Sequence, residues 1–194
     1  MKKIILASKS PRRSELLKNI GLEFSVIVTD TDESVVPKDL EPGLYVRELS
    51  FLKATAAAKT VKDDCYIIGA DTVVVLDGKI LGKPKDREEA FSMLSEMSGR
   101  VHSVYTSVTI TDTRSMFSVS EYEKTDVYFR TLSNEEINYY IDNYSVLDKA
   151  GAYGIQEFAS RFAERIDGDY FNIVGLPVCR LCKVFKREFG EDLI

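Results

Sequence analysis

The stretch CYIIGADTVVVL, residues 65–76, decides the fold class. Its first half, residues 65–70, is continuously apolar, which is typical of a central strand buried on both faces. Its second half, residues 72–76, is rich in β-branched side chains and predicts another strand segment. Asp71 stands between the two halves. We therefore expect a buried strand that ends in a carboxylate, with room beside the acid because Gly69 and Ala70 precede it.

Helical and strand patterns alternate on both sides of this stretch. Before it, the sequence predicts a strand, a helix, a second strand and a second helix at residues 3–7, 11–20, 24–28 and 42–61. After it, we expect a hairpin strand, a helix, two long antiparallel strands, a helix, a strand and a closing helix at residues 79–81, 86–97, 101–111, 118–129, 133–144, 171–174 and 176–189. This order predicts a mixed α/β fold, with a central sheet flanked by helices. Ligands in such folds bind in a crevice beyond strand ends.

The composition is that of a soluble globular protein. The chain has 194 residues, of which 44% are hydrophobic and 29% charged. Its length allows one large domain or two small ones, and we expect a single domain spanning residues 1–194. No apolar run approaches the roughly 18 residues of a membrane-spanning helix. The apolar stretch after Lys2 and Lys3 covers only residues 4–7, too short for a secretory signal, so we expect a cytoplasmic protein without a membrane partner.

The net charge and the cysteine content argue against several classes of function. The net charge is −5, which argues against non-specific nucleic-acid binding, since that depends on a basic face. Cys179 and Cys182 form a C-x-x-C pair, and Cys65 stands apart. A zinc site would need four ligands, and the chain has one histidine, His102. A thioredoxin-like pair is the other functional alternative, but reduced structural thiols are the favoured interpretation.

The segment Ser8-Lys9-Ser10-Pro11-Arg12-Arg13 places two arginines at the start of a predicted helix. A helix N-terminus is already partly positive, so arginines there are unfavourable unless an anion binds. Backbone N–H groups, serine hydroxyls and guanidinium groups would together make a phosphate site. An ordinary solvated basic turn is an equally good explanation of these residues taken alone.

Acids and lysines elsewhere could complete such a site. Asp71, followed by Thr72, could hold Mg²⁺ or orient a water molecule, although a turn acid at a strand end is common. Lys83 follows the hairpin, Lys53 lies among small residues of the second helix, and Glu33 belongs to an acidic cluster. Each alone is most simply a surface charge. As a set they supply what hydrolysis of a phosphoanhydride needs: carboxylates for a cation, cations for phosphate oxygens and a base for water.

The segment 149–156, KAGAYGIQ, has glycines that allow close backbone approach and ends in Gln156. The Gln156 amide could donate to and accept from the edge of a nucleobase. A mobile loop with a polar tip is the alternative. The chain has no G-x-x-x-x-G-K-[ST], G-x-G-x-x-G or G-x-S-x-G sequence, which excludes the common P-loop, dinucleotide-binding and hydrolase signatures.

These segments, in this order, resemble the Maf family of nucleoside triphosphate pyrophosphatases. The resemblance spans nearly the whole chain and rests on LASKSPRRSELL at 6–17, Asp32-Glu33, Lys53-Ala54, GADTVV at 69–74, GKP at 82–84, SGRVHSVYT at 98–106, DKAGAYGIQ at 148–156 and VGLP at 174–177. Ser107 departs from the small Gly or Ala that is usual in the family.

The resemblance implies hydrolysis of a nucleoside triphosphate between its α and β phosphates, with a divalent metal cation, Mg²⁺ or Mn²⁺. It implies two lobes with the active site in a cleft between them, and it leaves a homodimer open. Asp71 corresponds to the family's catalytic acid–base residue. The residues that correspond to its phosphate- and metal-handling groups are Ser8, Arg12, Arg13, Glu33, Lys53 and Lys83. Of these we expect Glu33, with Asp71, to hold the metal.

Three positions, Arg12, Thr72 and Gln156, resemble the branch of the family that hydrolyses dTTP and UTP. The branch acting on 7-methyl-GTP tends to carry an aromatic residue, a glutamine and a glutamate there. Arg and Gln can complement the acceptor–donor–acceptor edge of thymine or uracil. We therefore expect a dTTP/UTP pyrophosphatase. The alternatives are the same reaction on 7-methyl-GTP or modified nucleotides, and a nucleotide-binding regulator of cell division with little turnover.

Overall fold

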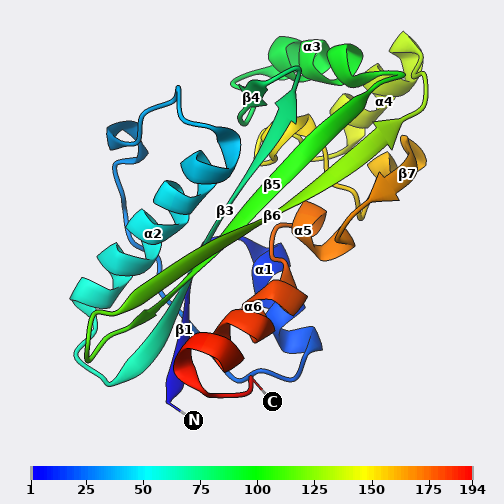
Figure 1. Ribbon diagram of the computed structural model, residues 1–194. Helices are drawn as coiled ribbons and strands as arrows, with labels where there is room; N and C mark the ends of the chain where they lie inside the picture. Colours follow the sequence, from blue (N-terminus) through cyan, green and yellow to red (C-terminus); the bar gives the residue numbers. More distant parts are fainter. Residues whose placement is uncertain (1, 194) are drawn as a thin grey trace. The chain divides into compact units, whose positions relative to one another are not determined.

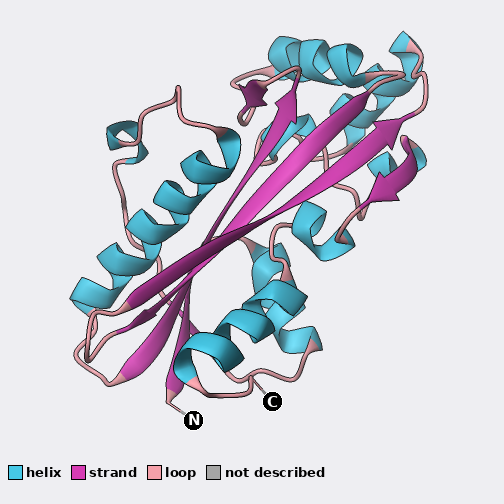
Figure 2. Cartoon of the chain, in the orientation of Figure 1, coloured by secondary structure: helices cyan, strands magenta, loops and turns pink. Residues whose placement is uncertain are grey.

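A computed structural model describes residues 2–193 and shows a mixed sheet flanked by helices (Figure 1; Figure 2), which confirms the predicted fold class. Within these residues the strand order is β2-β1-β3-β5-β6-β7, and β4 pairs with β3. The strands are β1 (Lys3–Ala7), β2 (Ser25–Val26), β3 (Cys65–Leu76), β4 (Lys79–Leu81), β5 (Val101–Asp112), β6 (Ser118–Phe129) and β7 (Ala163–Asp167). The helices are α1 (Pro11–Asn19), α2 (Pro42–Thr60), α3 (Arg87–Met97), α4 (Asn134–Asn143), α5 (Tyr170–Val174) and α6 (Val178–Val184).

The chain forms two compact units, and the boundary between them falls inside β3, between Asp71 and Thr72. The first unit holds residues 2–71, 106–123 and 175–193, and the second holds residues 72–105 and 124–174. β5 and β6 also contribute residues to both units. Asp71 is therefore the last residue of the first unit on this strand, and Thr72 the first of the second.

In the first unit, β1 pairs in parallel with β2 and with the start of β3, where Ala7 lies opposite Gly69. The helix α2 packs on these strands through small side chains, which allow a close approach. The buried cluster between them consists of Ile5, Ala7, Ala54, Ala57, Ala58, Cys65 and Ile67. In Figure 1, α2 lies on one side of these strands, and α1 and α6 lie on the other.

In the second unit, β3 and β4 form the predicted hairpin, with Val75 opposite Ile80. Asp77 and Gly78 both have positive φ, at 49° and 77°, as a tight two-residue turn requires. The predicted capping box at the start of α4 is present. The Ser133 hydroxyl accepts from the Glu136 N–H, and the Glu136 carboxylate accepts from the Ser133 N–H.

Two strand assignments from the sequence are wrong. Residues 171–174 belong to the short helix α5, because the Asp169 carboxylate accepts from the Phe171 N–H and turns the chain, while buried Asn172 donates to Val104 O and Thr125 Oγ1. Asp71 does not end a strand, since it lies inside β3, which spans 12 residues and continues to Leu76. The strand β7, antiparallel to β6, was not predicted at all. Among residues 2–193 no helix is both long enough and apolar enough to cross a membrane.

Candidate active site

Gly69 brings α2 directly against β3. A Cβ atom at this position would lie 2.5 Å from Ser50 O and 2.8 Å from Ala54 Cβ, closer than real side chains approach. The helix backbone therefore rests on the strand at a point two residues before Asp71. Lys53, one residue before Ala54 on α2, reaches the Asp71 carboxylate from this position.

Lys53 connects two acids. Its Nζ lies 2.5 Å from Asp71 Oδ1 and 2.9 Å from Glu33 Oε1. The Asp71 side chain is only 12% exposed, whereas Glu33, at the start of the 3-10 turn Glu33–Val35, is 51% exposed. The structure thus brings together three residues that the sequence placed on a loop, a helix and a strand. Their arrangement is a buried carboxylate, a cation and a solvent-facing carboxylate.

Burial has the largest effect on the pKa of the Asp71 carboxyl group. Loss of hydration raises the pKa of its carboxyl group above the ordinary value of 3.8, although the positive charges of Lys53 and Arg13 pull the pKa down. The effect of lost hydration on the pKa therefore exceeds the opposing effect of the two positive charges. A carboxylate with a raised pKa is a better proton acceptor than an ordinary aspartate, as a general base requires.

Tyr45 is a residue of this cluster that the sequence analysis missed. It lies on α2 eight residues before Lys53, and burial together with the negative charges of Asp71 and Glu33 raises the pKa of its hydroxyl group. Eight residues are slightly more than two helical turns, so the spacing from Lys53 is the signal that could have indicated it.

Arg13 lies beside the end of β1. Its Nη1 donates to Ser8 Oγ at 3.1 Å and to Ala70 O at 2.9 Å, and its Nε donates to Gly175 O at 2.8 Å. Burial, and secondarily the like charge of Arg12, lower the pKa of Arg13, while Asp71 and Glu33 oppose that effect. Ser8, Arg13 and Asp71 are therefore neighbours.

The start of α1 has the character that the sequence predicted. Ser10 stands at the N-cap position, but its side chain makes no capping hydrogen bond, and the first turn contains no acid. The partial positive charge of this helix end is thus reinforced by arginines rather than neutralised. An anion is the ligand that this combination favours.

The donor chemistry of Asp71 and Glu33 fits a divalent cation. Both offer carboxylate oxygens, which Mg²⁺ and Mn²⁺ prefer. Residues 2–193 contain no group of three or more His, Cys, Asp or Glu side chains arranged to hold a metal. Asp71 and Glu33 could supply one or two carboxylates to such a cation.

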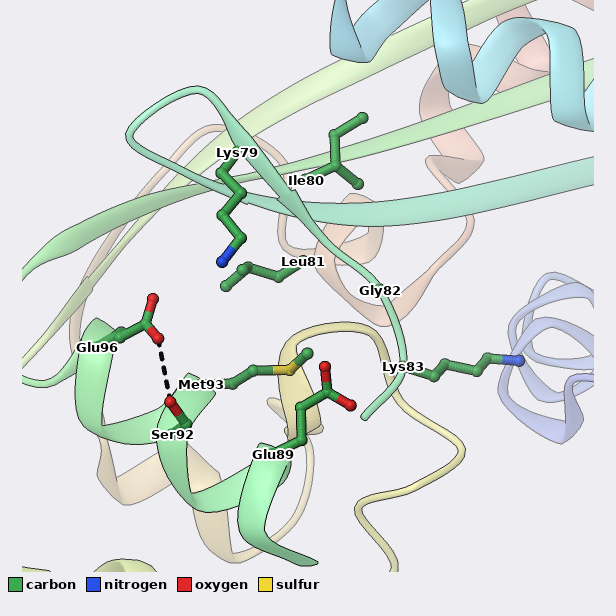
Figure 3. Close-up of a pocket in the computed structure, with 9 residues that line it drawn as sticks. All are labelled: Lys79, Ile80, Leu81, Gly82, Lys83, Glu89, Ser92, Met93 and Glu96. Atoms are coloured by element: carbon green, nitrogen blue, oxygen red, sulfur yellow. Dashed lines mark hydrogen bonds between the residues drawn. The ribbon is translucent and has the colours of Figure 1, made fainter. Parts of the chain in front are cut away.

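The remaining predicted residues belong to the second unit. Thr72 follows Asp71 on β3, and Lys83 and Gln156 have exposed side chains. The segments of the last two meet, because the Gly151 N–H donates to Gly82 O at 3.0 Å. A hollow of about 220 Å³ lies between β4 and α3, and Figure 3 shows Lys83 at its border with the ammonium group directed away from Glu89 and Ser92. The placement of the site in a cleft between two lobes stays a prediction.

Comparison with known proteins agrees with the resemblance to the Maf family that the sequence segments indicate. The family model described as Maf-like protein matches residues 3–188, and the chain belongs to the Maf family. A relative from Thermoanaerobacter sp. (strain X514), named dTTP/UTP pyrophosphatase, is 52% identical over 192 residues, which cover 99% of this chain and 100% of the relative. A relative of the same name from Clostridium novyi (strain NT) is 50% identical over 191 residues, covering 98% and 100%.

Solved structures include a more distant neighbour. The structure of the Staphylococcus aureus Ham1 protein matches 66% of this chain and 72% of its own, with 19% sequence identity and a TM-score of 0.48.

Proposed function

We propose that this protein hydrolyses dTTP and UTP between the α and β phosphates, releasing the nucleoside monophosphate and pyrophosphate. One observation carries the proposal: the buried Asp71 carboxylate is held by Lys53 beside Glu33, and Arg13 lies next to it at the end of β1. Membership of the Maf family and the names of relatives about 50% identical over their full length support the reaction and its substrates.

In this proposal Asp71 takes a proton from the attacking water. The water oxygen bonds to the α-phosphorus, the bond from that phosphorus to the bridging oxygen breaks, and pyrophosphate leaves with the bond electrons. Lys53 keeps Asp71 oriented and ionised, because its ammonium group lies 2.5 Å away. Ser8, Arg12 and Arg13 bind phosphate oxygens at the start of α1, and Lys83 stabilises charge on the leaving pyrophosphate.

Metal dependence belongs to the same proposal. Asp71 and Glu33 would hold Mg²⁺ or Mn²⁺, and the bound cation would neutralise charge on the phosphate oxygens. Arg12, Thr72 and Gln156 would select the base, since an arginine and an amide can match the acceptor–donor–acceptor edge of uracil and thymine. We further propose a single functional domain over residues 1–194 that acts in the nucleotide pool of the cytoplasm, with no nucleic-acid or membrane partner, and a homodimer stays open.

Product identification with a panel of triphosphates tests the function. We expect the purified protein with Mg²⁺ or Mn²⁺ to convert dTTP and UTP to monophosphate and pyrophosphate faster than dATP, GTP or 7-methyl-GTP. Equal or faster turnover of 7-methyl-GTP would contradict the proposal that dTTP and UTP are the preferred substrates. It would not contradict the proposed cleavage between the α and β phosphates. Nucleotide binding without pyrophosphate release, with metal present, would instead favour the alternative function, a nucleotide-binding regulator of cell division with little turnover.

A further inference from the structure

Lys149, a residue that the proposed mechanism does not use, is a buried lysine at the start of the loop that ends in Gln156. Its side chain is only 4% exposed. A buried ammonium group is costly unless it is fully paired. The Lys149 Nζ donates to Ser145 O, lies 3.1 Å from Asp148 Oδ1 and lies 3.9 Å from Glu157 Oε2. Its partners thus come from both sides of the loop 150–156, and the one cation joins the two ends.

The stem of Lys149 supports the middle of the same loop. A Cβ atom at Gly154 would lie 2.9 Å from Lys149 Cε and 3.1 Å from Cδ, so the loop backbone rests on these methylene groups. A side chain at this position would require the lysine stem or the loop backbone to shift. Lys149 therefore contacts the loop in two ways. Its ammonium group pairs with carboxylates at both ends of the loop, and its methylene groups pack against Gly154.

Other contacts hold the loop at Tyr153 and Gly154 and in the turn that follows. The Tyr153 hydroxyl pairs with His102 Nε2 at 2.7 Å, the Gly154 N–H donates to Tyr140 Oη at 3.2 Å, and the Glu157 N–H closes a turn on Gly154 O at 3.3 Å. Gln156 lies within that turn and is exposed. Lys149 adds a side-chain contact at the far side of the turn, where its Nζ lies 3.9 Å from Glu157 Oε2, to the backbone bonds from Glu157 N–H to Gly154 O and from Ser160 N–H to Glu157 O.

We propose that Lys149 is a positioning residue for nucleobase recognition, which orients Gln156 by holding both ends of its loop. The inference rests on the proposed function, in which Gln156 reads the base. Lys149 itself is buried beneath the loop and acts through Gln156. Its loss should weaken the discrimination between bases and leave the chemistry at Asp71 unchanged.

Discrimination between UTP and CTP separates positioning from simple support of the fold. The two bases differ along one edge, where cytosine carries an N4 amino donor and an N3 acceptor in place of the uracil O4 acceptor and N3–H donor. A site that hydrogen-bonds this edge rejects the wrong base because its own donor or acceptor would be left unpaired against that base. A variant that merely unfolds part of the protein lowers kcat/KM for both nucleotides by the same factor. A misplaced Gln156 lowers it for UTP alone.

Lys149→Met is the first test, because methionine keeps an unbranched apolar stem and removes the charge. We expect the ratio of kcat/KM for UTP to that for CTP to fall about tenfold, one hydrogen bond's worth of discrimination. The fall should come mainly from a higher KM for UTP, with an unchanged pH profile of kcat. Lys2→Met is the matched control, since Lys2 is also ion-paired, to Asp64 and Asp112, but belongs to the first unit, whereas the loop belongs to the second. Its ratio should equal that of the wild type.

Gly154→Ala tests the same inference with Lys149 intact. The added methyl group pushes the loop off the lysine stem, so this variant should also lose discrimination. A folded Lys149→Met protein with the wild-type ratio overturns the proposal. If Lys149→Met does not fold, the wild-type ratio in folded Gly154→Ala overturns it. A wild-type protein that does not prefer UTP to CTP refutes the base-reading function itself, and with it the inference.

Discussion

At the scale of single residues, Asp71 is both the proposed base and a source of instability. Burial raises its pKa despite Lys53 and Arg13, so its ionised form is less favourable in the folded protein than in water. We expect Asp71→Asn to lower kcat by on the order of 10²-fold or more. The same change should leave Tm unchanged or raise it, because an isosteric neutral group avoids the cost of burying the charge.

Pyrophosphate release and a thermal melt of the same preparation measure both effects. Asp64→Asn is the matched control, because that carboxylate is 45% exposed and pairs with Lys2 at the surface. It should change neither kcat nor Tm appreciably. A near-wild-type kcat in Asp71→Asn would show that another group activates water.

The raised pKa of Asp71 also predicts how stability depends on pH. The folded protein binds the Asp71 proton more tightly than the unfolded chain, whose value is near 3.8. Folding is therefore favoured at low pH by this group, and its contribution is lost as the pH rises from about 3.8 through the higher folded value. The free energy of unfolding of the wild type should fall over this window relative to that of Asp71→Asn. Urea unfolding of both proteins at several pH values measures it, and a constant difference would contradict the raised pKa.

At the scale of elements, the contact of α2 with β3 places Lys53. Gly69→Ala would put a methyl group 2.5 Å from Ser50 O, against helix backbone that cannot rotate away. We expect a loss of about 1–3 kcal/mol in the free energy of unfolding, as for other overpacked sites. The displaced helix should carry Lys53 away from Asp71, so kcat should fall as well.

Gly82→Ala is the control for stability, since nothing lies within 4 Å of a Cβ at that position and its φ is not positive. Denaturant unfolding and kcat are measured on both variants. A Gly69→Ala protein with wild-type stability would mean that α2 is not seated on β3 at this glycine.

Helices and strands were predictable where the hydrophobic pattern was long and where capping or turn residues marked its ends. The capping residues Ser133 and Glu136 marked the start of α4, and the pair Asp77-Gly78 marked the hairpin. Residues 171–174 were wrongly predicted as a strand because a run of four residues, three of them apolar, fits a strand or one helical turn equally, and contacts of Asn172 with residues far along the chain decide between them. The continuation of β3 through Asp71 was missed because a charged residue inside a buried strand is unfavourable unless it is paired, and the partner, Lys53, comes from another element.

At the scale of the whole molecule, the candidate site was predictable to the extent that its residues stand in distinctive short segments. Glu33, Lys53 and Asp71 were indicated in this way, and the structure brings them together, although their roles stay predictions. Tyr45 and the buried position of Lys149 were not predicted. A lysine in a sequence is usually a surface charge, and only the fold shows that Lys149 has carboxylates on both sides.

If the proposed function holds, one substrate molecule engages residues of both units, because Ser8, Arg12 and Arg13 belong to the first unit and Lys83 and Gln156 to the second. Hydrogen exchange with α,β-methylene-dTTP, which resists cleavage at the proposed bond, measures this. We expect slower exchange at residues 8–13 and also at residues 150–156. Pyrophosphate alone should protect residues 8–13 but not 150–156, since it has no base for Gln156 to contact. Protection confined to residues 8–13 with the nucleotide analogue would contradict the proposed recognition of the base by Gln156.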